Sequence, residues 1–124
     1  MKYGLIRKSL ILMLLAGMSQ FAVADDASAA KTIAGIVAGM NHFPSDTEKQ
    51  VLMGISEDNT NSQAVRSIAL AVHNTQHQAT AEDKARLNEI MASDASAEVK
   101  ALAEVLVGFL HSASEDAQAR LRAI

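Results

Sequence analysis

The stretch ASAAKTIAGIVAGMNHFPSDTEKQVLMGI, residues 27–55, recurs without a gap at residues 62–90 and again at residues 96–124. The three copies begin 35 and 34 residues apart. The clearest repeated columns are an alanine at Ala34, Ala69 and Ala103, a histidine at His42, His77 and His111, and a leucine at Leu52, Leu87 and Leu121. Because self-similarity at this period is typical of helical repeat proteins, the sequence predicts three copies of one helical unit.

Each copy has the pattern of a helical hairpin. The first half places apolar residues at positions i, i+3, i+4 and i+7, on one face of a helix. In the third copy these residues are Val99, Leu102, Ala103 and Leu106. The second half begins with a hydroxyl residue that can cap the free backbone N–H groups of a new helix. These caps are Ser45, Thr80 and Ser114.

The predicted fold is therefore all-α, with three tandem helical hairpins stacked as a short solenoid or a compact bundle. The six short helices are expected near residues 27–40, 46–55, 63–75, 81–91, 97–110 and 115–124. The expected core contains Ile33, Val37, Leu52, Ile55, Ile68, Ala69, Val72, Leu87, Ile90, Leu102, Ala103, Leu106 and Leu121. The column of Gly39, Asn74 and Gly108 either ends a helix in the left-handed conformation or permits close packing.

The first 24 residues have the pattern of a secretory signal peptide. Three basic residues, the apolar run of residues 10–18 and the Ala-Val-Ala of residues 22–24 follow in the order that such signals require. Nine apolar residues are too few for a membrane span, which needs about 20. We expect cleavage after residue 24, leaving residues 25–124 as a helical-repeat domain in the periplasm or outside the cell.

The composition of residues 25–124 excludes several classes of function. Eight basic and fourteen acidic residues give a net charge of −6, which argues against binding to nucleic acid or anionic lipid. Phe43 and Phe109 are the only Phe, Tyr or Trp residues there, so base stacking has little support. The chain has no cysteine, which excludes disulfides, thiol chemistry and thiolate metal sites.

The recurrent histidines have two interpretations. In a regular stack, equivalent positions on packed helices lie in a row about 8–10 Å apart. A zinc ion requires nitrogens within about 2.1 Å, so three such rings would not reach one ion. We therefore expect separate rings, each bonded to backbone groups of its own turn or lying against the end of the preceding helix, and no metal site at His42, His77 and His111.

One further histidine departs from the repeat. His73 has no histidine equivalent in the other copies and stands four residues before His77. On a continuous helix the two rings would share a face, as weak candidate ligands for zinc, copper or nickel. No third ligand accompanies this pair in the sequence.

The functional expectation is a non-enzymatic binding or scaffold protein. No nucleophile elbow, phosphate-binding loop or dinucleotide motif is present, and no catalytic residue or cofactor is predicted. The net negative charge favours a neutral or basic protein partner. The apolar stretch Ile33–Met40 permits self-association, and we expect Gly35 and Gly39 within it to be buried or to face a partner. The alternative is a periplasmic protein that binds a metal or a small ligand through histidines.

Overall fold

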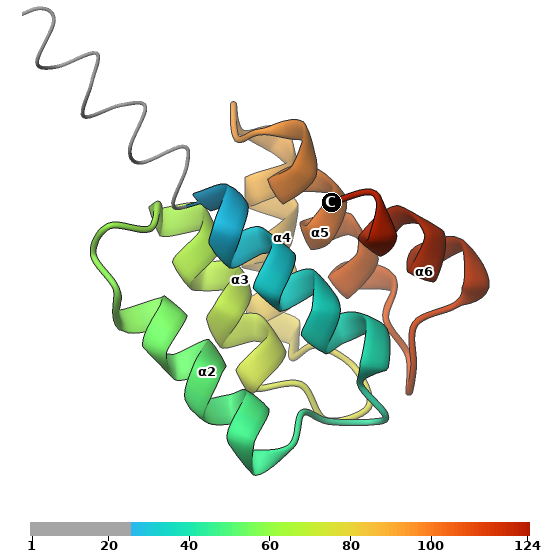
Figure 1. Cartoon of the computed structure of the whole chain (residues 1–124). Coiled ribbons are helices and arrows are strands. Elements are labelled where there is room, and N and C mark those ends of the chain that lie inside the picture. Colours follow the sequence, from blue (N-terminus) through green and yellow to red (C-terminus); the bar gives the residue numbers. More distant parts are fainter. Residues whose placement is uncertain (1–25) are drawn as a thin grey trace, which may run out of the picture.

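The computed structural model describes residues 26–124, so the predicted signal segment lies outside the described residues. Within this range there are six helices and no β-strand, which confirms the all-α prediction. A first helix over residues 26–39 is followed by α2 (Asp46–Glu57), α3 (Gln63–His73), α4 (Ala81–Ala92), α5 (Ala97–Gly108) and α6 (Glu115–Arg122) (Figure 1). From α2 onwards, each helix end lies within two residues of its expected position.

The helices begin where the predicted capping residues stand. In each of α2 to α6 the residue before the helix is a serine or threonine whose hydroxyl accepts a hydrogen bond from the backbone N–H three residues later. The caps are Ser45, Ser62, Thr80, Ser96 and Ser114. At Ser45 the side chain of Glu48 also accepts a hydrogen bond from the cap N–H, which completes a capping box.

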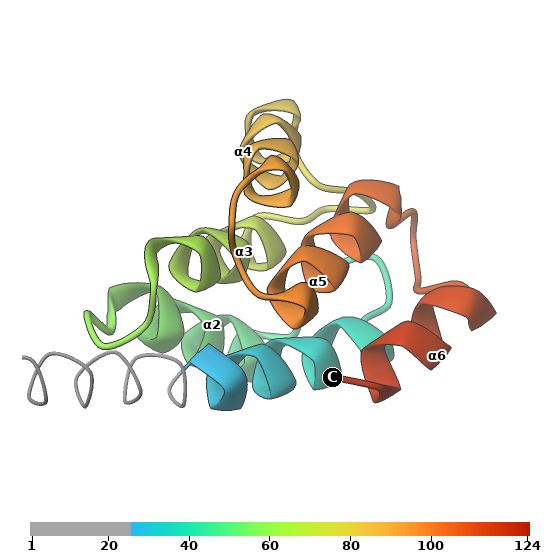
Figure 2. The same ribbon diagram turned by 90° about the horizontal axis from the view of Figure 1, so that it is seen from above.

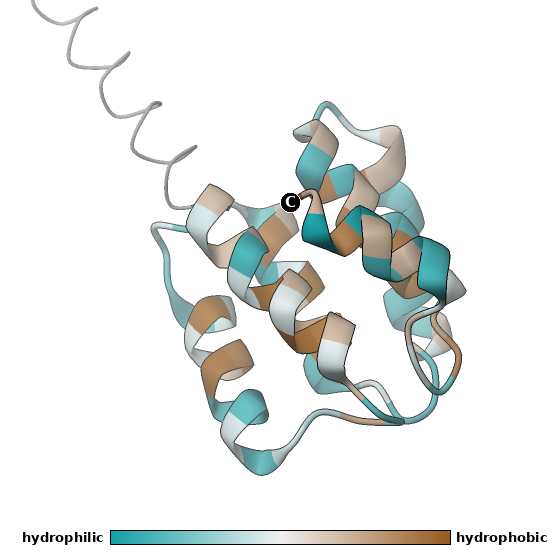
Figure 3. Ribbon diagram, turned by 45° about the vertical axis from the view of Figure 1, so that its right-hand side comes forward, coloured by the Kyte–Doolittle hydropathy of each residue, from teal (hydrophilic) through white to brown (hydrophobic). Residues whose placement is uncertain are grey.

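The helices form an inner and an outer set (Figure 2). The first helix, α3 and α5 lie inside and contribute most of the buried apolar residues, whereas α2, α4 and α6 lie outside and bury few. Figure 3 shows the strongly apolar segments within the helices and hydrophilic residues along most of the connections. Among residues 26–124, no helix combines the length and the apolar character that crossing a bilayer requires.

The last helix packs against the first. The side-chain amide of Gln118 in α6 donates a 2.6 Å hydrogen bond to the carbonyl of Ala38, 80 residues earlier. Leu121 of α6 is buried, and α6 and the first helix together line one surface pocket. Each helix from α2 to α5 packs on the next one along the chain, and α6 returns to the first helix, so the helices close on themselves. An open solenoid would leave its first and last helices apart.

The buried core agrees with the expected set, apart from Ile55, which is half-buried. In the apolar stretch of the first helix, Ile33, Val37 and Met40 are buried among the chain's own residues. Gly35 and Gly39 are exposed, so the part of the expectation that buried these two glycines was wrong, whereas a contact with a partner stays a prediction. A Cβ atom added at either position would have no neighbouring atom within 4 Å, so close packing does not require glycine there.

The glycine and asparagine column does not adopt the left-handed conformation. Asn74 caps α3 with a φ of −86°, and no described glycine has a positive φ. The first helix and α5 do end at Gly39 and Gly108. The chain changes direction three residues later in each unit, at the histidine.

Local side-chain hydrogen bonds order the connection between α2 and α3. The hydroxyl and the backbone N–H of Thr60 both donate to Asp58 and hold the pKa of that carboxyl below its ordinary value. The Asn61 side chain donates to the carbonyl of Ile55, and the Arg66 guanidinium donates to that of Ser56. These bonds satisfy carbonyl groups that the end of α2 leaves free.

We expect Leu87→Ala to lower the free energy of unfolding by about 2–5 kcal/mol, since truncating a large core side chain loses apolar contacts and leaves a cavity. The Leu87 side chain is fully buried between the outer helix α4 and the inner helices. Chemical denaturation monitored by circular dichroism measures the change. A loss below about 0.5 kcal/mol, the range usual for surface substitutions, would contradict this core.

We expect Gly35→Ala to raise the free energy of unfolding by about 0.5–1 kcal/mol, because alanine restricts the unfolded chain and favours helix. The exposed Gly54 of α2 has equally free surroundings and is the matched control, with the same expected gain. Denaturation and sedimentation velocity should be measured together. A change in association state in Gly35→Ala alone would instead indicate that Gly35 contacts a second copy.

Candidate metal centre

The three recurrent histidines stand at the centres of three matching tight turns. His42, His77 and His111 have φ values of 68°, 69° and 64° and are the only non-glycine residues with positive φ in residues 26–124. In the first turn the N–H of Phe43 donates to the carbonyl of Asn41, and in the third Ser112 donates to Leu110, both at 2.7 Å. In the second turn the bond runs the other way, from the N–H of Gln76 to the carbonyl of Gln78 at 3.3 Å. A three-residue turn with positive φ is rare and strained, and such strain is concentrated at functional sites.

Buried residues on both sides hold each turn in place. The residue two positions before the histidine is buried in all three units, as Met40, Thr75 and Phe109. Two positions after it come Pro44 and Ala79, both buried, and the half-buried Ala113. The residues directly beside each histidine are exposed. This alternation presents the histidine at the surface while its neighbours anchor the turn in the core.

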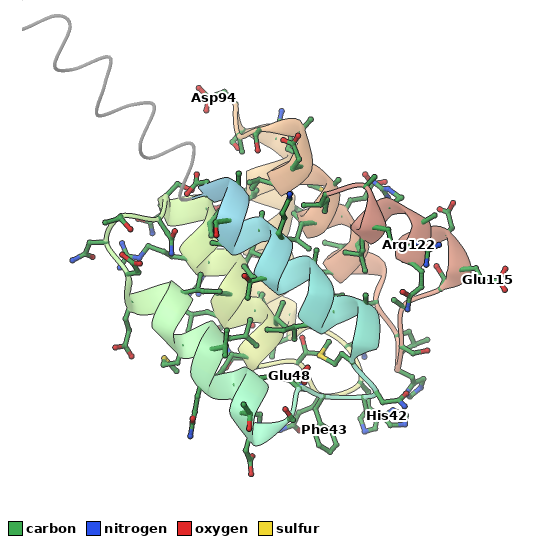
Figure 4. The ribbon with its side chains drawn as sticks, viewed as in Figure 1. His42, Phe43, Glu48, Asp94, Glu115 and Arg122 are labelled. Carbon is green, nitrogen blue, oxygen red and sulfur yellow. The ribbon has the colours of Figure 1, made fainter. Side chains whose placement is uncertain are left out.

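The backbones of the three histidines form a closed triangle of hydrogen bonds. His42 donates its N–H to the carbonyl of His111, His77 donates to His42, and His111 donates to His77, each at 2.6 Å. Every member thus donates once and accepts once. The connections after the three inner helices therefore meet around a common axis, at the end of the molecule where Figure 4 places His42 and Phe43.

The three imidazole rings converge on this axis. The Nδ1 atoms are 3.1 Å apart for His42 and His77, and 3.2 Å apart for the two pairs that include His111. The ring planes are inclined at 63° to 79° to one another. All three side chains are exposed. The expectation of separate rings in a row was wrong, because it assumed an open stack, whereas the closed ring of helices turns equivalent positions towards one axis.

The expected local role of these rings was also wrong. Their nitrogens contact one another, and the backbone bonds of the turns are made by main-chain groups instead. The pair of His73 and His77 does not share a helix face, because α3 ends at His73 and His77 lies beyond it in the turn. The Nδ1 atom of His73 lies 3.2 Å from the side-chain oxygen of Asn74, outside the cluster. His42 and His111 are the neighbours of His77 in the structure, and the sequence reasoning had considered this group of three and rejected it.

Carboxylates take no part in the cluster. The group of potential ligands contains three histidines and no Asp or Glu from residues 26–124. Asp83 is buried, but the Thr80 hydroxyl and, more weakly, the Asn74 amide donate to it at 2.9 and 3.4 Å. Asp83 therefore joins the end of α3 to the beginning of α4. Glu104 pairs with Arg120 at 2.9 Å on the surface.

A second candidate site is a cavity at the other end of the helices. It has a volume of about 570 Å³ and is lined by the N-terminal residues of the first helix, α3 and α5, together with Asp94 and Ile124. Figure 4 shows Asp94 at the end of the molecule away from His42. No histidine lines this cavity, and the caps Ser62 and Ser96 already accept from the helix N–H groups beside it. The convergent nitrogens mark the histidine cluster as the stronger candidate site.

Comparison with the models of known protein families, with curated proteins and with solved structures found no match. The chemistry of the histidine cluster therefore follows from its own donor atoms and distances.

The left-handed backbone at the cluster predicts that glycine is more stable than alanine there, the reverse of their order in a helix. In metal-free protein, His77→Gly should be more stable than His77→Ala by about 1 kcal/mol, because an L side chain raises the energy of this conformation. At His73, which is helical, the alanine variant should be the more stable by up to about 1 kcal/mol. Denaturation of the four variants checks the reversal. Alanine favoured at both positions would show that His77 does not hold a positive φ.

Proposed function

We propose that this protein binds one divalent transition-metal ion through the Nδ1 atoms of His42, His77 and His111. The observation that carries the proposal is the mutual separation of these nitrogens, 3.1–3.2 Å for every pair. Each copy of the repeat contributes one ligand. The site thus replaces the pair of His73 and His77 considered from the sequence.

The spacing of the nitrogens fits a tetrahedral metal ion. Nitrogen ligands lie about 2.0–2.1 Å from zinc, so two of them at a tetrahedral angle are about 3.3 Å apart. The observed spacing is within 0.1–0.2 Å of that value. A small closing or opening of the turns suffices to reach ideal bond lengths.

Hydrogen bonds between the rings do not account for all three short distances between the Nδ1 atoms. A neutral imidazole Nδ1 carries either one hydrogen or one lone pair in the ring plane. Three such atoms in a triangle make at most two N–H···N bonds, because a nitrogen that donates does not also accept. A cation at the axis interacts favourably with all three lone pairs at once.

The donor set favours zinc, copper or nickel. Imidazole nitrogen suits these ions, whereas calcium and magnesium prefer the oxygen ligands that this cluster lacks. The predicted signal peptide supports a periplasmic or secreted location, where the protein would acquire its metal. We further propose that residues 27–55, 62–90 and 96–124 are three hairpin repeats, which supply equivalent ligands because they share one construction.

A scaffold function has less support than metal binding. It rested on the open surface that helical-repeat arrays offer to partners. In the described residues the helices close on themselves, and the apolar side chains expected to mediate self-association, Ile33, Val37 and Met40, belong to the chain's own core. Partner binding is still an untested prediction.

Zinc binding should raise the free energy of unfolding, because the folded state alone brings the three nitrogens together. At a free zinc concentration 100 times the dissociation constant, the gain should be about 2.7 kcal/mol. Calorimetric titration should give one zinc ion per chain. Thermal melting with and without zinc should show an upward shift that His77→Ala abolishes.

The matched control is His73→Ala, which removes a histidine of the same region but outside the cluster. It should leave zinc stoichiometry and the melting shift unchanged. The proposal fails if wild-type protein binds no zinc, or if His77→Ala retains the full shift. Equal losses in His73→Ala and His77→Ala would favour the pair first considered from the sequence.

A further inference from the structure

Resting on the proposed metal site, we propose that the bound ion keeps a fourth coordination position open to solvent. Water or hydroxide occupies this position, and small monoanions exchange with it. The cluster is thus an open metal centre that binds an anionic ligand from solution, whereas a structural site has all four positions filled by protein.

The geometry of the three nitrogens leaves room for this ligand. An ion about 2.05 Å from three nitrogens spaced 3.1–3.2 Å apart lies about 0.9 Å out of their plane, with N–metal–N angles of about 100°. The three bonds therefore spread like the legs of a tripod. The fourth tetrahedral direction points along the axis, away from the nitrogens.

No fourth histidine, cysteine or carboxylate of residues 26–124 accompanies the three nitrogens. The main-chain N–H and carbonyl groups of His42, His77 and His111 are already paired with one another in the triangle. Because all three side chains are exposed, solvent reaches the axis. A structural zinc site, by contrast, is closed by four protein ligands.

The charge of the site selects an anion. Three neutral imidazoles leave the full double charge of the ion uncompensated, and no ion pair of the described residues involves the cluster. An ion with three protein nitrogens lowers the pKa of its bound water to about 7. Hydroxide and small monoanions such as azide should therefore compete for one position.

Cobalt(II) provides a visible probe of this position, because its absorption depends on coordination number and ligand. We expect wild-type protein to bind one cobalt ion with the intense visible absorption of four-coordinate geometry. Raising the pH should change the spectrum in a one-proton transition, without release of cobalt. Azide should change it saturably with a stoichiometry of one.

Competition with hydroxide makes the test quantitative. Below the spectral transition the apparent dissociation constant for azide should be independent of pH, and above it the constant should rise tenfold per pH unit. His73→Ala should reproduce both titrations. His111→Ala, which leaves two nitrogens, should bind cobalt at least tenfold more weakly.

The outcomes separate the two proposals. Protein that binds no cobalt and no zinc overturns the metal site and this inference with it. Protein that binds cobalt with a spectrum insensitive to azide and to pH overturns the open position alone, since the fourth ligand then comes from the chain. Saturable azide binding that is unaffected by hydroxide shows a separate anion site and also overturns the inference.

Discussion

The structure depends on the backbone triangle that joins His42, His77 and His111. Each of its three hydrogen bonds connects residues 34, 35 or 69 positions apart, so it forms only when all three inner helices are in place. The triangle pairs the main-chain groups of residues that lie outside any helix, and unpaired groups there would be costly wherever water is excluded. It also brings the three side chains to one axis.

The three histidines adopt a backbone conformation that residues with a side chain disfavour. A positive φ costs a residue with a side chain about 1–2 kcal/mol, and three residues carry that cost. Buried anchors on both sides, Met40 and Pro44 in the first unit, keep the turn in this conformation because moving it would expose them. The packing of the inner helices thus maintains the strain at the cluster, a relation typical of functional sites.

Repetition in the sequence and closure of the helices together explain how one histidine per copy makes a cluster of three rings. Equivalent residues of an open array point in parallel and stay about one helix spacing apart. Equivalent residues of a closed ring of three copies point towards the same axis. The exposed residues beside the histidines differ between copies, with Phe43, Gln78 and Ser112 at one position. Among the exposed residues of the turn, the histidine is the one that all three copies share.

The helices, their caps and most of the core could be predicted from the sequence, because these depend on neighbours within a few residues. The spacing of Leu102 and Leu106 defines a buried face, and a hydroxyl such as that of Thr80 begins a helix wherever the chain allows it. The end of α3 at His73 was less predictable, and it removes the continuous helix on which the weak candidate pair of His73 and His77 depended. The left-handed turn residue was sought among Gly39, Asn74 and Gly108, whereas the histidines adopt that conformation.

The convergence of the histidines was decided by tertiary structure alone. It requires the first helix, α3 and α5 to come together, and no local pattern specifies contacts over such sequence distances. The bond between Gln118 and Ala38, 80 residues apart, is another contact of this kind. The sequence determined that the same histidine occurs once in every copy. Whether the three copies form an open array or a closed one depends on how all the apolar helix faces pack together. This packing brings the three Nδ1 atoms to 3.1–3.2 Å from one another.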